Sequence, residues 1–291
     1  MRTVNQDTIT QAFLDYCGAD TDPRLRFVLE KLVTHLHDFA RDVDLTHDEW
    51  RKGLELLVKA GEISSPERNE FVLFSDILGL SSLVDMLHSP EIGTPSSVLG
   101  PFHILGAPDL ENGGDLKGDN EGATVVVSGT FTDPEGAPIK GVELEIWQTA
   151  DNGLYSNQDP GQTDYNLRAH LILGDDGNYR FSTVRPAPYT VPEDGPAGDL
   201  LRATGRHPWR PSHLHFIATA PGFRSLVTEV FPSDDPYLDE DAVFGVRPKL
   251  VMEYKEQTSL DKLPDGMAVK TADVTMPFYT VDFDFVLTRE K

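Results

Sequence analysis

The sequence predicts an α+β protein, with a helical N-terminal part followed by an antiparallel β-sandwich. The first observation is the hydrophobic period, which is helical up to about residue 90 and changes to two from about residue 95. The second is that the later strand patterns are short and separated by turn signals, with no helical pattern between them, which is typical of a sandwich. We therefore predict a helical domain over residues 1–95 and a β-sandwich domain over residues 96–291.

Three helical segments are expected in the N-terminal part. Asp22-Pro23 is a typical helix start, and the apolar residues after it, from Leu25 to Ala40, recur at helical spacing. The run from Thr46 to Glu49 has the form of a capping box and opens a second helix that Gly61 ends. A third helix is expected to start at residues 65–67.

The C-terminal part carries four clear strand signals. Residues 124–132 are rich in β-formers and stop at the turn sequence 133–136, and residues 142–146 alternate apolar with other residues. A turn at 176–178 precedes a strand that begins at Tyr179, and residues 281–285 alternate again. The Gly-, Asp- and Asn-rich segment 109–122 is expected to be an exposed loop.

Composition limits the possible partners. A formal charge of -23 argues against nucleic acid or an anionic membrane as a partner, because neither would be attracted at long range. With 39% hydrophobic and 25% charged residues the chain is not expected to be disordered. Cys17 is the one cysteine, and no run approaches the roughly 18 apolar residues of a membrane span. We expect a soluble cytoplasmic protein.

The motif His213-Leu214-His215 carries the most chemical information. Alternate residues of a strand share a face, so both histidines would point the same way, within reach of one ion. Leu214 and Phe216 would face the opposite way, into the core. Two histidines on an outer strand face are more often simply solvated, and that interpretation stays open for the motif by itself.

Two tyrosines lie in unusual loops. Tyr155 follows the strand that ends at Trp147, and Tyr189 lies in a segment whose three prolines would fix the backbone. Rigid loops at a strand edge are suited to presenting a ligand, although an ordinary surface aromatic is the commoner role of a single tyrosine.

Taken together, these segments resemble the iron(III) intradiol ring-cleaving dioxygenases, with the hydroxyquinol-cleaving branch nearest. The resemblance covers about Phe71 to the C-terminus and includes the helical cap. It rests on the order and spacing of five motifs, which are Leu99-Gly100-Pro101-Phe102, Gly153-Leu154-Tyr155-Ser156, Pro188-Tyr189-Thr190-Val191-Pro192, Arg210-Pro211-Ser212-His213-Leu214-His215 and Ala220-Pro221-Gly222-Phe223.

The resemblance implies one Fe(III) per subunit, bound by Tyr155, Tyr189, His213 and His215. This donor set suits the ion, because a hard, highly charged metal favours phenolate oxygen and would deprotonate a tyrosine whose ordinary pKa is about 10. Two phenolates and a hydroxide balance the three positive charges. Two histidines and a carboxylate would instead point to Fe(II).

The resemblance also implies the reaction. A small aromatic diol or triol chelates the iron, displacing hydroxide and Tyr189, which take up substrate protons. Reaction with O2 then opens the ring between the two hydroxylated carbons, giving 3-hydroxy-cis,cis-muconate or maleylacetate from hydroxyquinol. Arg210 is assigned a catalytic role, since its permanent positive charge would stabilise negative charge that develops on the substrate.

Asp76 is the position that bears on substrate choice. By resemblance it faces the pocket, where catechol-cleaving members tend to place a small or apolar residue, and the third hydroxyl of hydroxyquinol would satisfy its carboxylate. Asp76 facing water, and cleavage of catechol or chlorocatechol, remain alternatives. The other expected pocket residues are Leu73, Val98, Gly100, Pro101, Phe102, Val191, Pro192, Arg210 and Val243.

Some features leave other interpretations open. Glu229 replaces the glutamine of catechol-cleaving members, and its role is unexplained at this stage. The segment 138–147 resembles transthyretin-like modules that only bind, and a zinc hydrolase is weakened by the lack of a carboxylate at ligand spacing. The N-terminal helices carry apolar residues on more than one face, which fits a packed cap or, by resemblance, a homodimer interface that holds a phospholipid.

Overall fold

The computed structural model describes residues 4–65 and 68–290 and divides into two compact units, up to Lys59 and from Ala60 onward. The predicted division after residue 95 differs from this one, because the helices between 70 and 88 belong to the unit that holds the sheets. As a functional boundary, the division at 95 stays a prediction.

The first unit contains α1 (Ile9–Asp15), α2 (Pro23–Asp42) and most of α3 (His47–Ile63). The predicted caps are present: Asp22 accepts a hydrogen bond from the Leu25 backbone N–H, with proline at the first turn of α2. Thr46 and Glu49 exchange hydrogen bonds as a capping box, and each satisfies the other's backbone N–H at the start of α3. Helix α1 lacks such signals and was not predicted.

In the second unit, α4 (Glu70–Ile77) and α5 (Leu80–His88) precede the sheets. The predicted helix start at residues 65–67 is wrong for Ser65, because α4 begins after Asn69, whose side chain accepts from the N–H groups of Phe71 and Val72. Pro66 and Glu67 lie outside the described residues.

No single helix within 4–65 and 68–290 is long and apolar enough to cross a membrane. Helices α4 and α5 taken together meet the test of length and composition, with a 72° bend between them.

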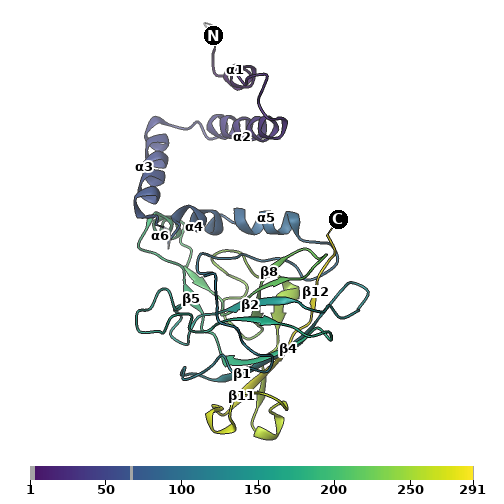
Figure 1. Ribbon diagram of the computed structural model, residues 1–291. Helices are drawn as coiled ribbons and strands as arrows, with labels where there is room; N and C mark the ends of the chain where they lie inside the picture. The colour runs from purple at the N-terminus through teal and green to yellow at the C-terminus, as the bar shows by residue number, and fades with distance from the viewer. Residues whose placement is uncertain (1–3, 66–67, 291) are drawn as a thin grey trace. The chain divides into compact units, whose positions relative to one another are not determined.

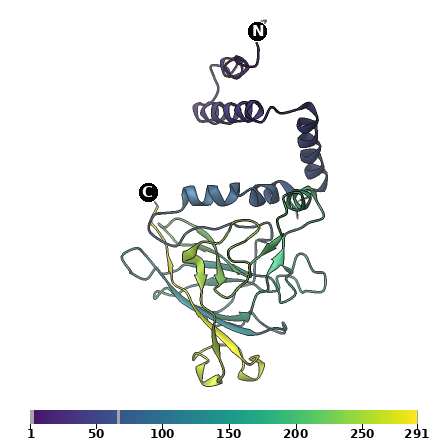
Figure 2. The same ribbon diagram turned by 180° about the vertical axis from the view of Figure 1, so that it is seen from behind.

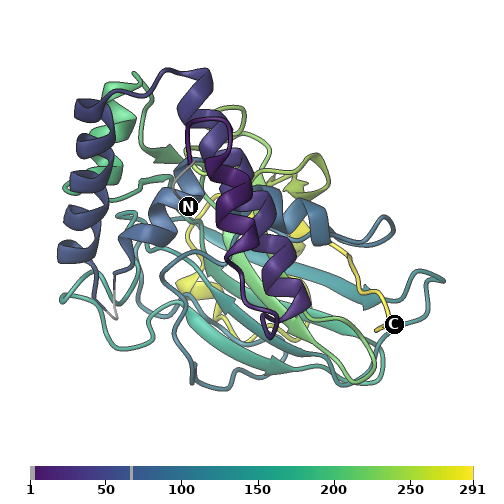
Figure 3. The ribbon, with the colours of Figure 1, turned by 90° about the horizontal axis from the view of Figure 1, so that it is seen from above.

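Two five-stranded sheets form the sandwich that the sequence predicts (Figures 1 and 2). The first has the order β3-β2-β7-β8-β9, and in the second the order is β10-β11-β1-β12, with β4 also paired to β1. The strands are β1 (Thr124–Thr132), β2 (Glu143–Trp147), β3 (Arg168–Ile172), β4 (Asn178–Val184), β7 (Leu214–Thr219), β8 (Leu226–Pro232), β9 (Val251–Met252), β10 (Lys255–Gln257), β11 (Phe278–Asp282) and β12 (Phe285–Val286). A separate pair joins β5 (Tyr189–Thr190) to β6 (Trp209–Arg210). Figure 3 shows the strands from above.

The sheets are mixed rather than wholly antiparallel, since β1 runs parallel to β11 and β12, and β8 runs parallel to β9. The expected strand 281–285 is interrupted, because Asp284 turns to accept a hydrogen bond from the Thr130 backbone N–H. Gly129 makes this approach possible, since a Cβ there would collide with the Phe283 carbonyl.

One helix contradicts the expectation of a helix-free β part. Helix α6 (Pro196–Ala203) begins after Gly195, with proline in its first turn, and its eight residues are too few for a clear helical period. The fully buried Glu70 carboxylate accepts from the Ala197 N–H, and Arg68 bonds both oxygens of Asp194. These contacts tie α4 to the segment that follows β5.

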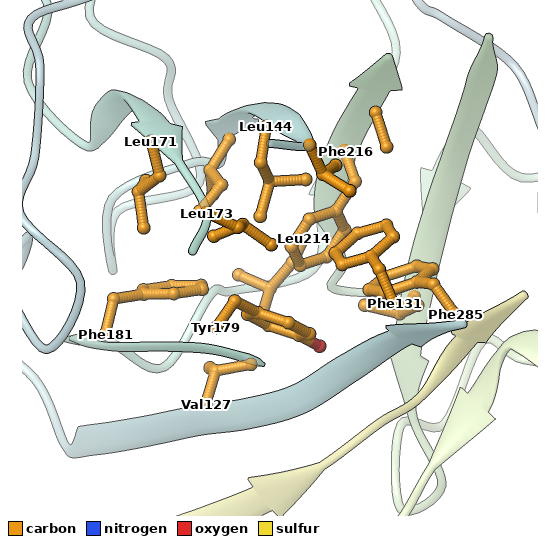
Figure 4. Packing of buried hydrophobic residues seen from close by; sticks show 14 of the residues in the cluster. Val127, Phe131, Leu144, Leu171, Leu173, Tyr179, Phe181, Leu214, Phe216 and Phe285 are labelled. Atoms are coloured by element: carbon orange, nitrogen blue, oxygen red, sulfur yellow. The ribbon is translucent and has the colours of Figure 1, made fainter. Parts of the chain in front are cut away.

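The core lies between the two sheets (Figure 4). Leu214 and Phe216 of β7 are fully buried there, with Phe131 and Phe285 among their neighbours. Burying such side chains contributes about 1.5–3 kcal/mol each. This anchors β7 by one face, as predicted, and leaves the side chains at 213 and 215 to the opposite face.

Candidate metal centre

Three of the four candidate ligands meet at their donor atoms. The hydroxyl oxygen of Tyr155 lies 3.2 Å from His213 Nε2 and 3.0 Å from His215 Nε2, and the two Nε2 atoms are 3.1 Å apart. The fourth, Tyr189, has its ring 5.6 Å from the rings of both Tyr155 and His213. All four side chains are buried, so the histidines are not the solvated pair that the motif alone left open.

The donor triangle fits a single metal ion. Metal–donor bonds of about 2.0–2.2 Å place neighbouring donors roughly 3 Å apart. The single hydroxyl proton of Tyr155 can serve only one of the two Nε2 atoms, whereas a cation would satisfy all three donors. Burial lowers the pKa of both histidines, which favours the neutral, ligating form. Burial also raises the pKa of Tyr155 and Tyr189, so phenolate formation needs a strongly charged ion.

The histidine rings are held in place by their surroundings. His213 Nδ1 lies 2.8 Å from the carbonyl of Pro211, which assigns the proton to Nδ1 and leaves Nε2 as a donor to a metal. His215 stacks on Trp147 with a 4.5 Å centroid separation and an interplanar angle of 5°. Neither contact was predicted, because a backbone carbonyl and a neighbouring strand carry no motif.

Phe102 packs against both candidate tyrosines. Its ring stacks on Tyr155 at 4.8 Å and meets Tyr189 edge-on at 6.5 Å. Gly100 has φ +69°, and a Cβ there would lie 3.6 Å from the His215 ring. Val98 and Val191 are buried and Pro101 and Pro192 half-buried, and their part in the pocket stays a prediction.

Arg210 is fully buried and is shared by two carboxylates. Its Nη1 and Nη2 atoms donate to the two oxygens of Glu229 at 2.8 and 2.9 Å, and its Nε donates to Asp241 at 3.1 Å. Nη1 also lies 3.5 Å from the Tyr189 hydroxyl and 3.4 Å from His213 Nε2. The guanidinium is thereby fixed beside the candidate ligands.

The position of Glu229 answers the question left by the sequence. It faces His215 across β7–β8, accepts a 2.9 Å hydrogen bond from Ser97, and lies 3.5 Å from His215 Nδ1. Together with His213 and His215 it forms a group able to hold a metal, so the missing carboxylate cited against zinc is present after all. Glu229 is bound at both oxygens by Arg210, and its Oε1 lies 3.5 Å from His215 Nδ1 and 3.4 Å from His213 Nε2.

Asp76 is buried at 4% exposure and does not face water. It shares a face of α4 with the buried Leu73, one helical turn away. Burial raises the pKa of Asp76, while Ser81 and Arg210 oppose that rise. Arg206 donates to the carbonyls of Ile77 and Ala242 and so ties α4 to the loop that carries the buried Val243.

Comparison with known proteins agrees with this geometry. A family model described as "Dioxygenase" matches residues 99–289, and one described as "Catechol dioxygenase N terminus" matches residues 22–92. This chain belongs to the intradiol ring-cleaving dioxygenases. The enzyme is therefore an oxidoreductase that acts on an aromatic substrate with O2, in a family that depends on iron, and a purely binding transthyretin-like module and a zinc hydrolase are excluded.

The similarity to individual dioxygenases extends over nearly the whole chain. The hydroxyquinol 1,2-dioxygenase of Rhizobium sp. (strain MTP-10005) is 41% identical over 92% of this chain and 90% of its own. The 6-chlorohydroxyquinol 1,2-dioxygenase of Cupriavidus pinatubonensis is 42% identical over 99% of both chains. Among solved structures, hydroxyquinol 1,2-dioxygenase from Pseudomonas putida DLL-E4 has a TM-score of 0.89 and 41% identity, covering 98% of this chain and 99% of that one.

Proposed function

We propose that this dioxygenase cleaves hydroxyquinol with O2 to 3-hydroxy-cis,cis-muconate, the tautomer of maleylacetate, in aromatic catabolism. One Fe(III) per subunit would be held by Tyr155, Tyr189, His213 and His215. The observation that carries the proposal is the buried triangle of Tyr155, His213 and His215 donor atoms, 3.0–3.2 Å apart. The hydroxyquinol-cleaving relatives and the buried Asp76 favour the triol over catechol or chlorocatechol.

The bound iron would supply a Lewis-acid centre that the two adjacent substrate oxygens chelate. The chain's own residues then have distinct roles. Tyr189 would hold a substrate proton on its phenol oxygen, since burial raises the pKa of its phenol. Arg210, held by Glu229 and Asp241, places a fixed positive charge where negative charge develops on the substrate. Phe102 covers both tyrosines and keeps water from them.

Asp76→Ala should shift preference from hydroxyquinol toward catechol. A hydrogen bond to a charged group contributes about 1.5–3 kcal/mol, so the ratio of kcat/KM for hydroxyquinol over catechol should fall about 10- to 100-fold. Initial O2 uptake with both substrates, corrected for autoxidation, measures the ratio. Asp85→Ala, on the neighbouring α5, is the matched control and should leave it unchanged. An unchanged ratio in Asp76→Ala would remove Asp76 from the pocket.

We also propose a cytoplasmic homodimer formed through α2 and α3, with a phospholipid held between their apolar side chains. The exposed residues that support this interface are Leu25, Phe27, Val28, Leu32, Leu36, Phe39, Trp50, Leu54, Leu57 and Val58. Soluble proteins rarely leave this many apolar side chains of neighbouring helices exposed to water, so a partner surface is expected to cover them. The wild type should sediment as a dimer and release lipid on solvent extraction, and Leu32→Glu with Leu36→Glu should give a lipid-free monomer. A monomeric wild type would contradict the interface.

A further inference from the structure

A second buried arginine, Arg168, lies over the ring of Tyr155. Arg168, the first residue of β3, is only 3% exposed. Its Nε donates to Ser156 at 2.9 Å and its Nη2 donates to Asn157 at 3.1 Å. The centre of its guanidinium lies 5.8 Å from the centroid of the Tyr155 ring, within the range of a cation–π contact.

Arg168 differs from Arg210 in its charge balance. Arg210 is paired with Glu229 and Asp241, so two carboxylates face one guanidinium. For Arg168, the part of the chain that the structure describes supplies no carboxylate at ion-pair distance, and its buried Nη1 has no hydrogen-bond partner. Burial lowers the pKa of Arg168 to about 10, which still leaves it charged at neutral pH. A buried cation without a counter-charge is costly, and such a cost calls for a compensating role.

The backbone before Arg168 is also unusual. Tyr165 and Leu167 have φ values of 58° and 55°, the left-handed region that costs non-glycine residues about 1 kcal/mol or more. This turn brings Arg168 into β3 opposite Trp147, the residue that stacks on His215. The two hydrogen-bond partners of Arg168, Ser156 and Asn157, directly follow Tyr155 in the chain. The Arg168 side chain therefore also holds the loop that carries Tyr155.

We propose that Arg168 is a positioning residue for Tyr155, whose uncompensated charge stabilises negative charge on the phenolate oxygen and whose hydrogen bonds fix the ligand loop. This rests on the proposed function, in which Tyr155 binds iron. Among residues 4–65 and 68–290 no carboxylate forms an ion pair with Arg168, so the phenolate under its guanidinium is the negative charge that balances it. Arg210, already shared by two carboxylates, contributes less net positive potential there.

The energy of phenolate-to-iron charge transfer reports on this charge directly. Removing a cation beside the phenolate raises the energy of its donor electrons, so the visible band of iron-loaded Arg168→Met should move to longer wavelength than in the wild type. Iron binding, measured by competition with a chelator, should weaken by about 10- to 100-fold, the range found for residues that contact metal ligands. Arg168→Lys should restore most of the band position, since it keeps the charge.

Two controls separate charge from loop fixation. Ser156→Ala combined with Asn157→Ala removes the hydrogen bonds but keeps the cation, so its band should stay near that of the wild type. Arg185→Met removes an arginine that lies over Tyr254 and Tyr279 instead, and it should leave band and affinity unchanged. If Arg168→Met does not fold, Arg168→Gln takes its place, with an amide that can still bond Ser156.

The outcomes are distinguishable from failure of the proposed function. A wild-type protein that stays colourless with iron overturns the ligand assignment and this inference with it. A coloured wild type whose band does not move in Arg168→Met or Arg168→Gln overturns the role of Arg168 alone. A shift that the Ser156 and Asn157 double variant reproduces in full assigns the effect to loop geometry and also overturns the electrostatic role.

Discussion

His213→Ala and Tyr155→Phe are each expected to lose iron and dioxygenase activity together. Each removes one corner of the donor triangle, in which every separation is 3.0–3.2 Å. Among the described residues, Glu229 is the carboxylate that groups with these histidines, and Arg210 binds both of its oxygens, so it is not free to replace the lost donor. Turnover should fall by more than about 100-fold, beyond the loss typical of residues one step removed from the ligands. Iron content, the visible band and O2 uptake measured on one sample check this.

A neighbouring aromatic pair offers a matched control for these ligand variants. His207 and Tyr237 have ring centroids 5.6 Å apart, but His207 pairs with Glu240 and takes no part in the donor triangle. His207→Ala and Tyr237→Phe should therefore keep full iron content and turnover. A Tyr155→Phe or His213→Ala protein that binds one iron and turns over normally would contradict the proposed metal centre.

Arg210→Met should cause a large loss of stability as well as activity. It leaves Glu229 and Asp241 buried without their cation, and breaking such a pair costs about 3–5 kcal/mol. Urea unfolding at neutral pH measures the cost. The exposed pair between Arg51 and Asp48 is the control, since Arg51→Met should change stability by less than about 1 kcal/mol.

The pH dependence of this loss follows from Asp241. Burial raises the pKa of Asp241, but Arg210 and the N–H groups of Val243 and Gly245 outweigh burial, so its pKa in the folded protein is lowered. A lowered pKa adds stability above the ordinary carboxyl pKa, and that stability is lost as the pH falls through the folded value. In Arg210→Met burial would instead raise the pKa of Asp241, so the stability difference from wild type should be largest at neutral pH and shrink as the pH falls to and below the ordinary carboxyl pKa. A pH-independent difference would contradict the pairing.

Adding Glu229→Gln to Arg210→Met separates stability from catalysis. Glu229→Gln removes one of the two buried carboxylates that have lost their cation. It should recover part of the free energy of unfolding, because a neutral amide costs less to bury than a carboxylate. Activity should not return, since no cation faces the substrate. Recovery of turnover in the double variant would show that the charge of Arg210 is not needed for the reaction.

Features with a local physical cause were predictable from the sequence. The helix starts at Asp22 and Thr46 follow from side chains that satisfy backbone N–H groups three residues away. The alternation of β7 follows from strand geometry, which sends Leu214 and Phe216 to the core and the two histidines to the other face. Where no strong local signal exists, as in α6 or the break between β11 and β12, prediction failed.

The charge arrangement around the centre depended on the tertiary structure. Glu229 and Asp241 reach Arg210 from 19 and 31 residues away, and Ser97 reaches Glu229 from 132 residues away. No spacing rule connects such positions, because the sheet pairing and the burial that follows from it bring them together. Arg168 pairs with Trp147 where β2 and β3 meet, and there it contacts Tyr155 of the loop that connects the two strands. The sequence by itself identified which donor atoms are available, whereas the tertiary structure decided which charges face them, because electrostatic energies depend on distances and burial that arise only when the sheets pack.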